Sequence, residues 1–226
     1  MVTIEKVKEW FLTLSDVYSK NREYLTDLDA AIGDADHGIN LDRGFSAVRG
    51  EIEKMSSGGT GAESGSGGAG ESGYGSSFPE FFRSVSMTLI KTIGGASGAL
   101  LGTFFLEISR TVKAEKEMDG AKLVSALKAG VEGIKKRGHA QEGDKTMLDT
   151  WIPALRAMES EAASGGSVET ILAAGLKNAE EGIGSTRSMI ARKGRASYLG
   201  ERSIGHLDPG AVSSYMMIKA AAKTLS

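Results

Sequence analysis

The stretch from Val7 to Tyr18, VKEWFLTLSDVY, shows the pattern that decides the fold. Apolar side chains recur in it every three or four residues, and most of the positions between them are charged or polar. This spacing places the apolar side chains on one face of a helix, because an α-helix repeats every 3.6 residues. The sequence therefore predicts an amphipathic helix whose buried face carries Val7, Trp10, Phe11, Leu14, Val17 and Tyr18.

The same periodicity returns along most of the chain. Short polar segments separate the periodic runs, and no run alternates every second residue as a half-buried strand would. We therefore predict an all-α protein of about eight or nine helices, with its functional groups in the loops. Further helices are expected near residues 24–28, 43–55, 78–93, 100–108, 119–137, 143–158, 167–183 and 208–222.

Several expected helix ends carry capping residues. Asp119, Ser167 and Asp208 are predicted N-caps, and Pro209 follows the last of them in the first helical position. Gly138 is the expected residue just after the end of its helix.

Composition and charge exclude several classes of function. The chain has 226 residues and a net charge of -2, which gives no reason to expect nucleic acid or a membrane surface as partner. No apolar run resembles a signal peptide or a membrane span, so we expect a cytoplasmic location. Because cysteine is absent, disulfides, thiolate catalysis and zinc-thiolate sites are excluded.

One segment, residues 56–77, differs from the rest. Gly and Ser dominate it, and such a composition cannot form a core, so we predict a flexible insertion. Its residues 65–70, GSGGAG, match the dinucleotide fingerprint G-x-G-x-x-G. The match is judged false, because the preceding strand and the following helix that the motif requires are absent.

Chemistry is concentrated in the acidic segment, residues 29–40, which reads DAAIGDADHGIN. Carboxylates this close together repel one another unless a cation neutralises them. Their oxygens suit Mg²⁺, with part of the coordination sphere left for a phosphate. A solvated acidic turn, in which Asp and Gly serve only backbone geometry, is the alternative interpretation.

Two further segments could bind phosphate. Gly94 to Gly98 stands where one helix ends and another begins, and residues 192–203 carry four positive charges against one negative charge. A glycine cap with a close helix crossing, and a solvated basic loop, are the respective alternatives. No P-loop and no kinase catalytic loop is present. Together with the acidic segment, these features favour an Mg-nucleotide enzyme that transfers a phosphoryl group.

Five motifs then carry a resemblance, and they occur in one order: Leu28-Asp29 with residues 33–38, residues 94–98, residues 143–147, residues 194–203, and Gly205-His206 with residues 208–211. In kind and order they resemble the nucleotide-binding L subunit of dihydroxyacetone kinase, the DhaL family. The similarity covers nearly the whole chain except the insertion. It implies a single nucleotide-binding domain over residues 1–226, interrupted by the insertion at 56–77.

The resemblance also implies a fold and a site. The fold would be an antiparallel barrel of eight amphipathic helices with the nucleotide in the loops at one end. Asp29, Asp34 and Asp36 match the family's ligands of two Mg²⁺ ions. The positions that match its nucleotide contacts are His37, Gly38, Ile39, Asn40, Ala96, Ser97, Gly138, Met147, Arg195, Asp208, Pro209 and Gly210. Asp42 departs from the family's common Asn and could change the charge near the metals.

The family transfers a phosphoryl group to dihydroxyacetone, which a separate K subunit holds covalently on a histidine. In one type, ADP stays bound as a cofactor and is rephosphorylated by the M subunit of the phosphotransferase system. In the other type, ATP is an exchanging substrate for dihydroxyacetone or a related keto-sugar. The chain contains no K region, which favours the first type. Outside catalysis, an ADP-loaded chain that docks on a transcriptional regulator is the alternative function.

Overall fold

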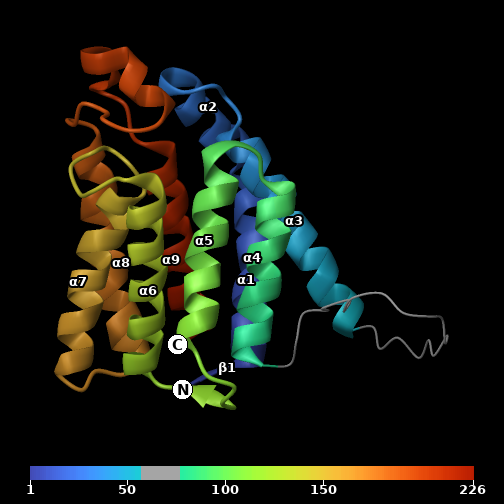
Figure 1. Cartoon of the computed structure of the whole chain (residues 1–226). Coiled ribbons are helices and arrows are strands. Elements are labelled where there is room, and N and C mark those ends of the chain that lie inside the picture. Colours follow the sequence, from blue (N-terminus) through green and yellow to red (C-terminus); the bar gives the residue numbers. More distant parts are fainter. Residues whose placement is uncertain (57–76) are drawn as a thin grey trace.

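The computed structural model describes residues 1–56 and 77–226, and in this part of the chain it confirms the all-α prediction (Figure 1). The predicted insertion lies almost wholly, and the 65–70 motif entirely, outside the described residues. The helices are α1 Ile4–Lys20, α2 Arg22–Ile32, α3 His37–Ser56, α4 Phe78–Thr92, α5 Gly95–Thr111, α6 Gly120–Gly138, α7 Leu148–Ala163, α8 Val168–Thr186, the 3-10 helix η1 Arg195–Ser203, and α9 Pro209–Thr224.

The long helices contact one another in a closed order. From α3 to α9 each helix packs against the next, and α1 packs against both α3 and α9. The remaining helix, α2, lies against α3, α9 and η1. An antiparallel barrel of eight helices would have this order of neighbours.

The helices alternate in direction around this ring (Figure 1). As a result α3, α5, α7 and α9 all begin at the same end of the molecule, where α2 and η1 also lie. Both chain termini lie at the opposite end. Each helix N-terminus exposes backbone N–H groups and partial positive charge, so the end with four of them is suited to anions.

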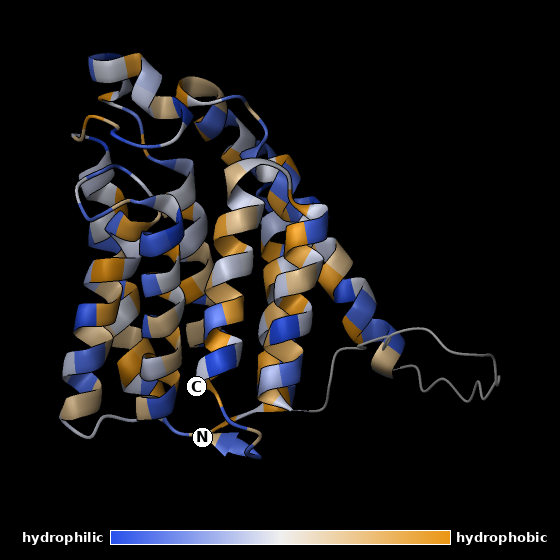
Figure 2. Ribbon diagram, viewed as in Figure 1, coloured by the Kyte–Doolittle hydropathy of each residue, from blue (hydrophilic) through white to orange (hydrophobic). Residues whose placement is uncertain are grey.

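The core is formed largely by the apolar faces that the sequence pattern predicts, and hydrophobic and hydrophilic residues alternate along the helices (Figure 2). Val17 is the exception on α1, because it is only partly buried and lies outside the core. An aromatic cluster joins α1 to its neighbours: the ring of Phe11 lies 5.1 Å from those of Trp10 and Phe105. Such pairs add roughly 0.5–1.5 kcal/mol each to the burial of their area. Tyr18 on α1 also donates a hydrogen bond to the Ser213 carbonyl of α9, at 3.0 Å. The first and last helices are thereby joined.

The three predicted N-caps are confirmed. Asp119, Ser167 and Asp208 accept hydrogen bonds from the backbone N–H groups three residues ahead, at 2.8, 3.2 and 2.7 Å. The predicted end of α6 is wrong by one residue, because Gly138 still belongs to the helix. His139 takes the left-handed conformation instead, with φ of 47°.

Two predicted helix starts are also wrong. The helix expected from residue 43 begins at His37, because the carboxylate of Asp29, on the preceding helix, accepts the N–H groups of Asp36 and His37. The helix expected from Gly143 begins at Leu148, because residues 143–147 form a turn on the carboxylate of Asp149.

The expectation that no strand is needed requires a small correction. Val2–Thr3 (β1) pairs antiparallel with Glu117–Met118 (β2), far from the end where α3, α5, α7 and α9 begin. Among the helices that the structure describes, none is long and apolar enough to span a membrane.

Candidate nucleotide and metal site

A cavity of about 390 Å³ lies at the end of the molecule where four helices begin. Its walls come from the acidic segment, the start of α5, the α6–α7 turn, the basic loop (residues 187–206) and the start of α9. One part of the wall is polar and carries carboxylates, and another part is apolar. The apolar residues include Leu100, Ile134, Ala140 and Met147.

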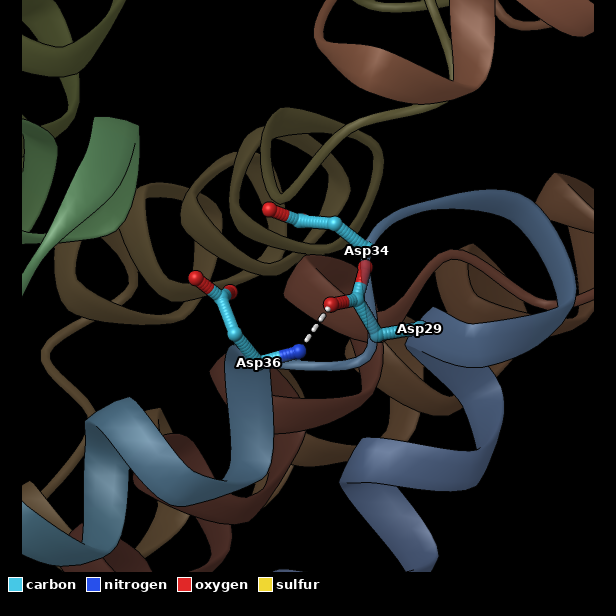
Figure 3. A group of neighbouring side chains, drawn as sticks. All are labelled: Asp29, Asp34 and Asp36. Atoms are coloured by element: carbon cyan, nitrogen blue, oxygen red, sulfur yellow. Dashed lines mark hydrogen bonds between the residues drawn. The ribbon is translucent and has the colours of Figure 1, made fainter.

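Asp29 organises the acidic segment. Its Oδ2 accepts hydrogen bonds from the backbone N–H groups of Asp36, at 2.9 Å, and His37, at 3.1 Å (Figure 3). These N–H groups stand at the start of α3 and have no partner within the helix. A buried carboxylate at this position is stabilised by the positive end of α3. The chain between Asp29 and His37 therefore folds back, so that the Asp29 side chain meets the start of α3.

Gly33 is required for this arrangement. It ends α2, and its own N–H donates to the Asp29 carbonyl oxygen. A Cβ atom at residue 33 would lie 2.0 Å from Asp29 Oδ1. Any larger residue would therefore displace the carboxylate.

The three carboxylates predicted to bind metal are brought together (Figure 3). One oxygen from each of Asp29, Asp34 and Asp36 lies within 4.8 Å of the other two. Asp29 is buried, whereas Asp34 and Asp36 remain accessible to solvent. Three oxygen donors that converge from one side suit a hard divalent cation, with its other coordination positions open to water or phosphate.

His37 joins this segment to two other walls of the cavity. Its Nδ1 lies 3.3 Å from Ser97 Oγ on α5, and its Nε2 lies 2.9 Å from Ser213 Oγ on α9. Burial lowers the pKa of His37, although the nearby carboxylates of Asp29 and Asp36 oppose this effect. The imidazole therefore favours its neutral form and acts as a hydrogen-bonding bridge.

The basic loop faces the acidic segment across the cavity. Arg195 Nε lies 2.8 Å from Asp34 Oδ2, and both side chains are partly exposed. A small apolar cluster of Ile32, Ala191 and Ala196 packs the basic loop against the end of α2. This contact places a guanidinium beside the carboxylate cluster.

Asp208 closes the cavity at the start of α9. Burial raises the pKa of Asp208 to about 7, and the negative charges of Asp149 and Asp29 act in the same direction. The Ala211 N–H and the Lys145 ammonium oppose this rise. Asp208 therefore carries a proton over a wider pH range than an ordinary carboxyl group.

Most predicted site residues line the cavity, but three do not. Gly38 packs against α2, where a Cβ would lie 2.0 Å from the Arg22 carbonyl oxygen. Ile39 is exposed outside the cavity, and Asn40 is buried and accepts a hydrogen bond from Arg43 at 2.6 Å. Those that line it are Asp29, Asp34, Asp36, His37, Ala96, Ser97, Gly138, Met147, Arg195, Asp208, Pro209 and Gly210.

Asp42 does not lie in the carboxylate cluster. Its carboxylate is 3.8 Å from Arg22 and accepts a hydrogen bond from Ser46. The charge that Asp42 adds is therefore paired with a local arginine and lies outside the carboxylate cluster.

Sequence reasoning missed Lys145, Thr146 and Arg137 as cavity residues. Lys145 is buried, with its side chain directed toward the basic loop. Its position within the motif GDKTM was the available signal, but these residues were assigned to a helix start.

Fold and cavity together define a class: a helical protein whose cavity, at one end, is lined by a carboxylate cluster with a cation beside it. Comparison with known proteins assigns the chain to a family. Residues 61–223 match the family model described as the DAK2 domain. The chain is 39% identical over 217 residues to the PEP-dependent dihydroxyacetone kinase, ADP-binding subunit DhaL, of Escherichia coli, covering 96% of this chain and 95% of that protein.

A second relative is the PTS-dependent dihydroxyacetone kinase, ADP-binding subunit DhaL, of Lactococcus lactis. It is 38% identical over 95% of this chain and 94% of its own length. The chain therefore belongs to the DhaL family of dihydroxyacetone kinase subunits, and the predicted family is confirmed. The predicted enzyme class is confirmed with it, because these relatives are named kinase subunits.

Solved structures show the same fold. The dihydroxyacetone kinase of C. freundii in its native form has a TM-score of 0.67 and 23% identity over 97% of this chain. The same kinase in complex with AMP-PNP and Mg²⁺ has a TM-score of 0.65. In both comparisons the present chain spans about a third of the kinase chain, 33%.

Proposed function

We propose that the chain is the Mg-ADP-binding subunit of a dihydroxyacetone kinase and forms one nucleotide-binding domain over residues 1–226. The observation that carries this proposal is the convergence of Asp29, Asp34 and Asp36 opposite Arg195, in a cavity ringed by helix N-termini. Family membership agrees with it, because relatives of nearly equal length are named ADP-binding subunits.

The three carboxylates would hold Mg²⁺, and we propose two ions. When bound there, Mg²⁺ would supply positive charge that neutralises the charge developing during phosphoryl transfer. Asp29 is the fixed ligand, since the two N–H groups of α3 already hold its carboxylate. Asp34 and Asp36 are accessible and can adjust to the ions.

The start of α5 would bind the phosphates. Ala96 and Ser97 lie in its first turn, where backbone N–H groups are free of helix partners. The apolar wall of the cavity gives the adenine ring a surface that excludes water, formed in part by Leu100, Ile134 and Met147. Gly138, Pro209 and Gly210 complete the walls around it.

Arg195 would neutralise phosphate charge. It pairs with Asp34 in the structure, and both groups are solvent-accessible enough to exchange partners. If Asp34 held a cation, the guanidinium would lose this partner and could neutralise a phosphate group instead. A guanidinium suits this role because its planar N–H groups match phosphate oxygens.

We further propose that the phosphoryl acceptor is dihydroxyacetone on a partner K subunit and that the donor is a phosphorylated M subunit acting on retained ADP. The names of the relatives, PEP-dependent and PTS-dependent, support this donor. ATP as an exchanging substrate is the second candidate. It is supported by the C. freundii kinase of the same fold, whose structure was solved with AMP-PNP, an analogue of ATP.

A reconstituted reaction tests the function. The purified chain, preloaded with Mg-ADP, is mixed with a K subunit that carries dihydroxyacetone, and either phosphorylated M subunit or ATP is added. We expect dihydroxyacetone phosphate with the M subunit and little with ATP. Turnover with ATP alone would show that ATP, and not the M subunit, is the donor. Absence of product with either donor would contradict the proposed function.

Two matched variants test whether the reaction depends on the carboxylate cluster. Asp34→Asn should lower turnover by roughly a hundredfold or more, because it removes a charged metal ligand at nearly constant size. Asp42→Asn is the control, since Asp42 lies on α3 outside the carboxylate cluster. Equal turnover in the two variants would contradict the assignment of the site.

A further inference from the structure

Lys145 is an unusual residue, because its lysine side chain is almost fully buried. Only 1% of its surface is exposed. Long charged side chains are rarely buried unless they are paired. The group that pairs with this ammonium therefore defines what the residue does.

The partners of the ammonium are backbone carbonyl oxygens from distant parts of the chain. Lys145 Nζ donates to the carbonyls of Thr186, Ser203 and His206 at 2.7, 2.7 and 2.6 Å, and lies 3.3 Å from that of Met189. These carbonyls lie 41 to 61 residues further along the chain. The three short bonds of one ammonium thus connect the end of α8 with the C-terminal end of the basic loop, and the longer contact reaches Met189 near its start.

The backbone of Lys145 belongs to the cavity wall. It has a left-handed conformation, with φ of 60°, which few residues other than glycine adopt. The turn around it is fixed by carboxylates: Asp144 accepts the N–H of Gln141, and Asp149 accepts those of Gly143 and Thr146. A fixed turn therefore directs one side chain into the basic loop.

Few other hydrogen bonds hold the basic loop to the rest of the described chain. The N–H of Arg192 donates to the Asp144 carbonyl at 3.0 Å, again in the turn of Lys145. Within the loop, Gly205 and Arg187 bond to each other. Residues 187–189 also continue the hydrogen bonding at the end of α8. Arg195 pairs with Asp34, and Ile32 makes an apolar contact with the loop. The remaining hydrogen bonds between this loop and the rest of the described chain converge on the Lys145 turn.

We propose that Lys145 is a positioning residue, whose ammonium holds the basic loop closed and thereby keeps Arg195 beside the carboxylate cluster. It does not touch the carboxylates and acts through Arg195, which reaches Asp34 at 2.8 Å. The functional part of this role rests on the proposed function. The structural part, closure of the loop, stands apart from it.

Limited trypsin digestion measures closure directly, because the basic loop carries five cleavage sites at Arg187, Arg192, Lys193, Arg195 and Arg202. Lys145→Met keeps the length of the side chain and removes its donors. Cleavage within residues 187–206 should become about tenfold faster or more, as expected when local opening becomes easier. Lys145→Arg, which keeps charge and donors, should restore part of the protection.

The control is Lys128→Met. Lys128 is exposed on α6 and pairs only with Glu159 among the contacts described. Its removal should leave cleavage of the basic loop unchanged. If Lys145→Met does not fold, Lys145→Gln, which retains two donors, serves in its place. Unchanged cleavage in the folded variant would overturn the proposal.

Coupling to Arg195 is tested by ADP affinity in the presence of Mg²⁺. Lys145→Met and Arg195→Met should each weaken ADP binding, and the double variant should be no weaker than Arg195→Met alone. Additive losses would overturn the claim that Lys145 acts through Arg195. If the wild-type chain binds no ADP, the proposed function fails, whereas the trypsin result still decides whether Lys145 closes the loop.

Discussion

The acidic segment and the basic loop face each other across one cavity, but different kinds of contact hold them. In the acidic segment, Asp29 bonds to residues only four to eight positions ahead of it, and Gly33 leaves the space that its carboxylate needs. The basic loop depends on Lys145, which precedes its partners by 41 to 61 residues. The Asp29 carboxylate is therefore preorganised locally, whereas the guanidinium is positioned by the tertiary structure.

This difference predicts separate responses to pH and to mutation. The largest expected effect comes from Asp208, which follows the basic loop. Its pKa is about 7 in the native state against 3.8 for an ordinary Asp, so the native state keeps a proton that the unfolded state loses. In the metal-free protein, the free energy of unfolding should therefore fall as pH rises from about 4 through 7, by roughly 4 kcal/mol from this group.

Urea unfolding of the metal-free protein at several pH values measures the slope. Asp208→Asn should remove this contribution, because the amide oxygen can still accept the Ala211 N–H but no longer ionises. The variant would then be more stable than the wild type above pH 7. If the free energy of unfolding changed with pH equally in both proteins, Asp208 would be ionised over the whole pH range, and the prediction would be contradicted.

The next effect concerns Gly33 in the acidic segment. In Gly33→Ala the added Cβ would lie 2.0 Å from Asp29 Oδ1, so the carboxylate must move away from α3. We expect a loss of roughly 1–3 kcal/mol in the free energy of unfolding, together with much weaker Mg²⁺ binding. Urea unfolding and a Mg²⁺ titration measure the two effects. Trypsin cleavage of the basic loop should not change, and faster cleavage there would contradict independent support of the two regions.

A smaller effect, of opposite sign in pH to that of Asp208, should come from His37. Burial lowers its pKa below the ordinary value of 6.5, so below that pH the unfolded state takes up a proton that the native state does not. The free energy of unfolding should therefore fall as the pH falls through this range. The ring resonances in NMR spectra report its titration. A native His37 that titrates at or above 6.5 would contradict this prediction.

The smallest effect is expected at Gly50, which serves as the matched control for Gly33. Gly50 lies in α3, and a Cβ there would meet nothing within 4 Å. Gly50→Ala should raise the free energy of unfolding by about 0.5–1 kcal/mol, because alanine favours the helix. Thermal unfolding measures this gain, and Mg²⁺ affinity should stay the same. A lower free energy of unfolding in Gly50→Ala would show that a side chain at residue 50 clashes with another part of the protein.

The same contrast explains what the sequence could predict. The all-α class followed from apolar periodicity, and the carboxylate cluster followed from three Asp residues within eight positions. The start of α3 was missed because its capping carboxylate, Asp29, lies on the preceding helix. The role of Lys145 was missed because its partners are backbone carbonyls, whose positions depend on tertiary packing and leave no pattern in the sequence.

The central claim is that the cavity binds ADP through metal held by the acidic segment. Calorimetric titration of ADP into the chain, with saturating Mg²⁺ and then with EDTA, tests it most directly. We predict binding with Mg²⁺, a large loss with EDTA, and the same loss in Asp36→Asn with Mg²⁺ present. ADP binding that is equally tight in EDTA and in Asp36→Asn would contradict the account.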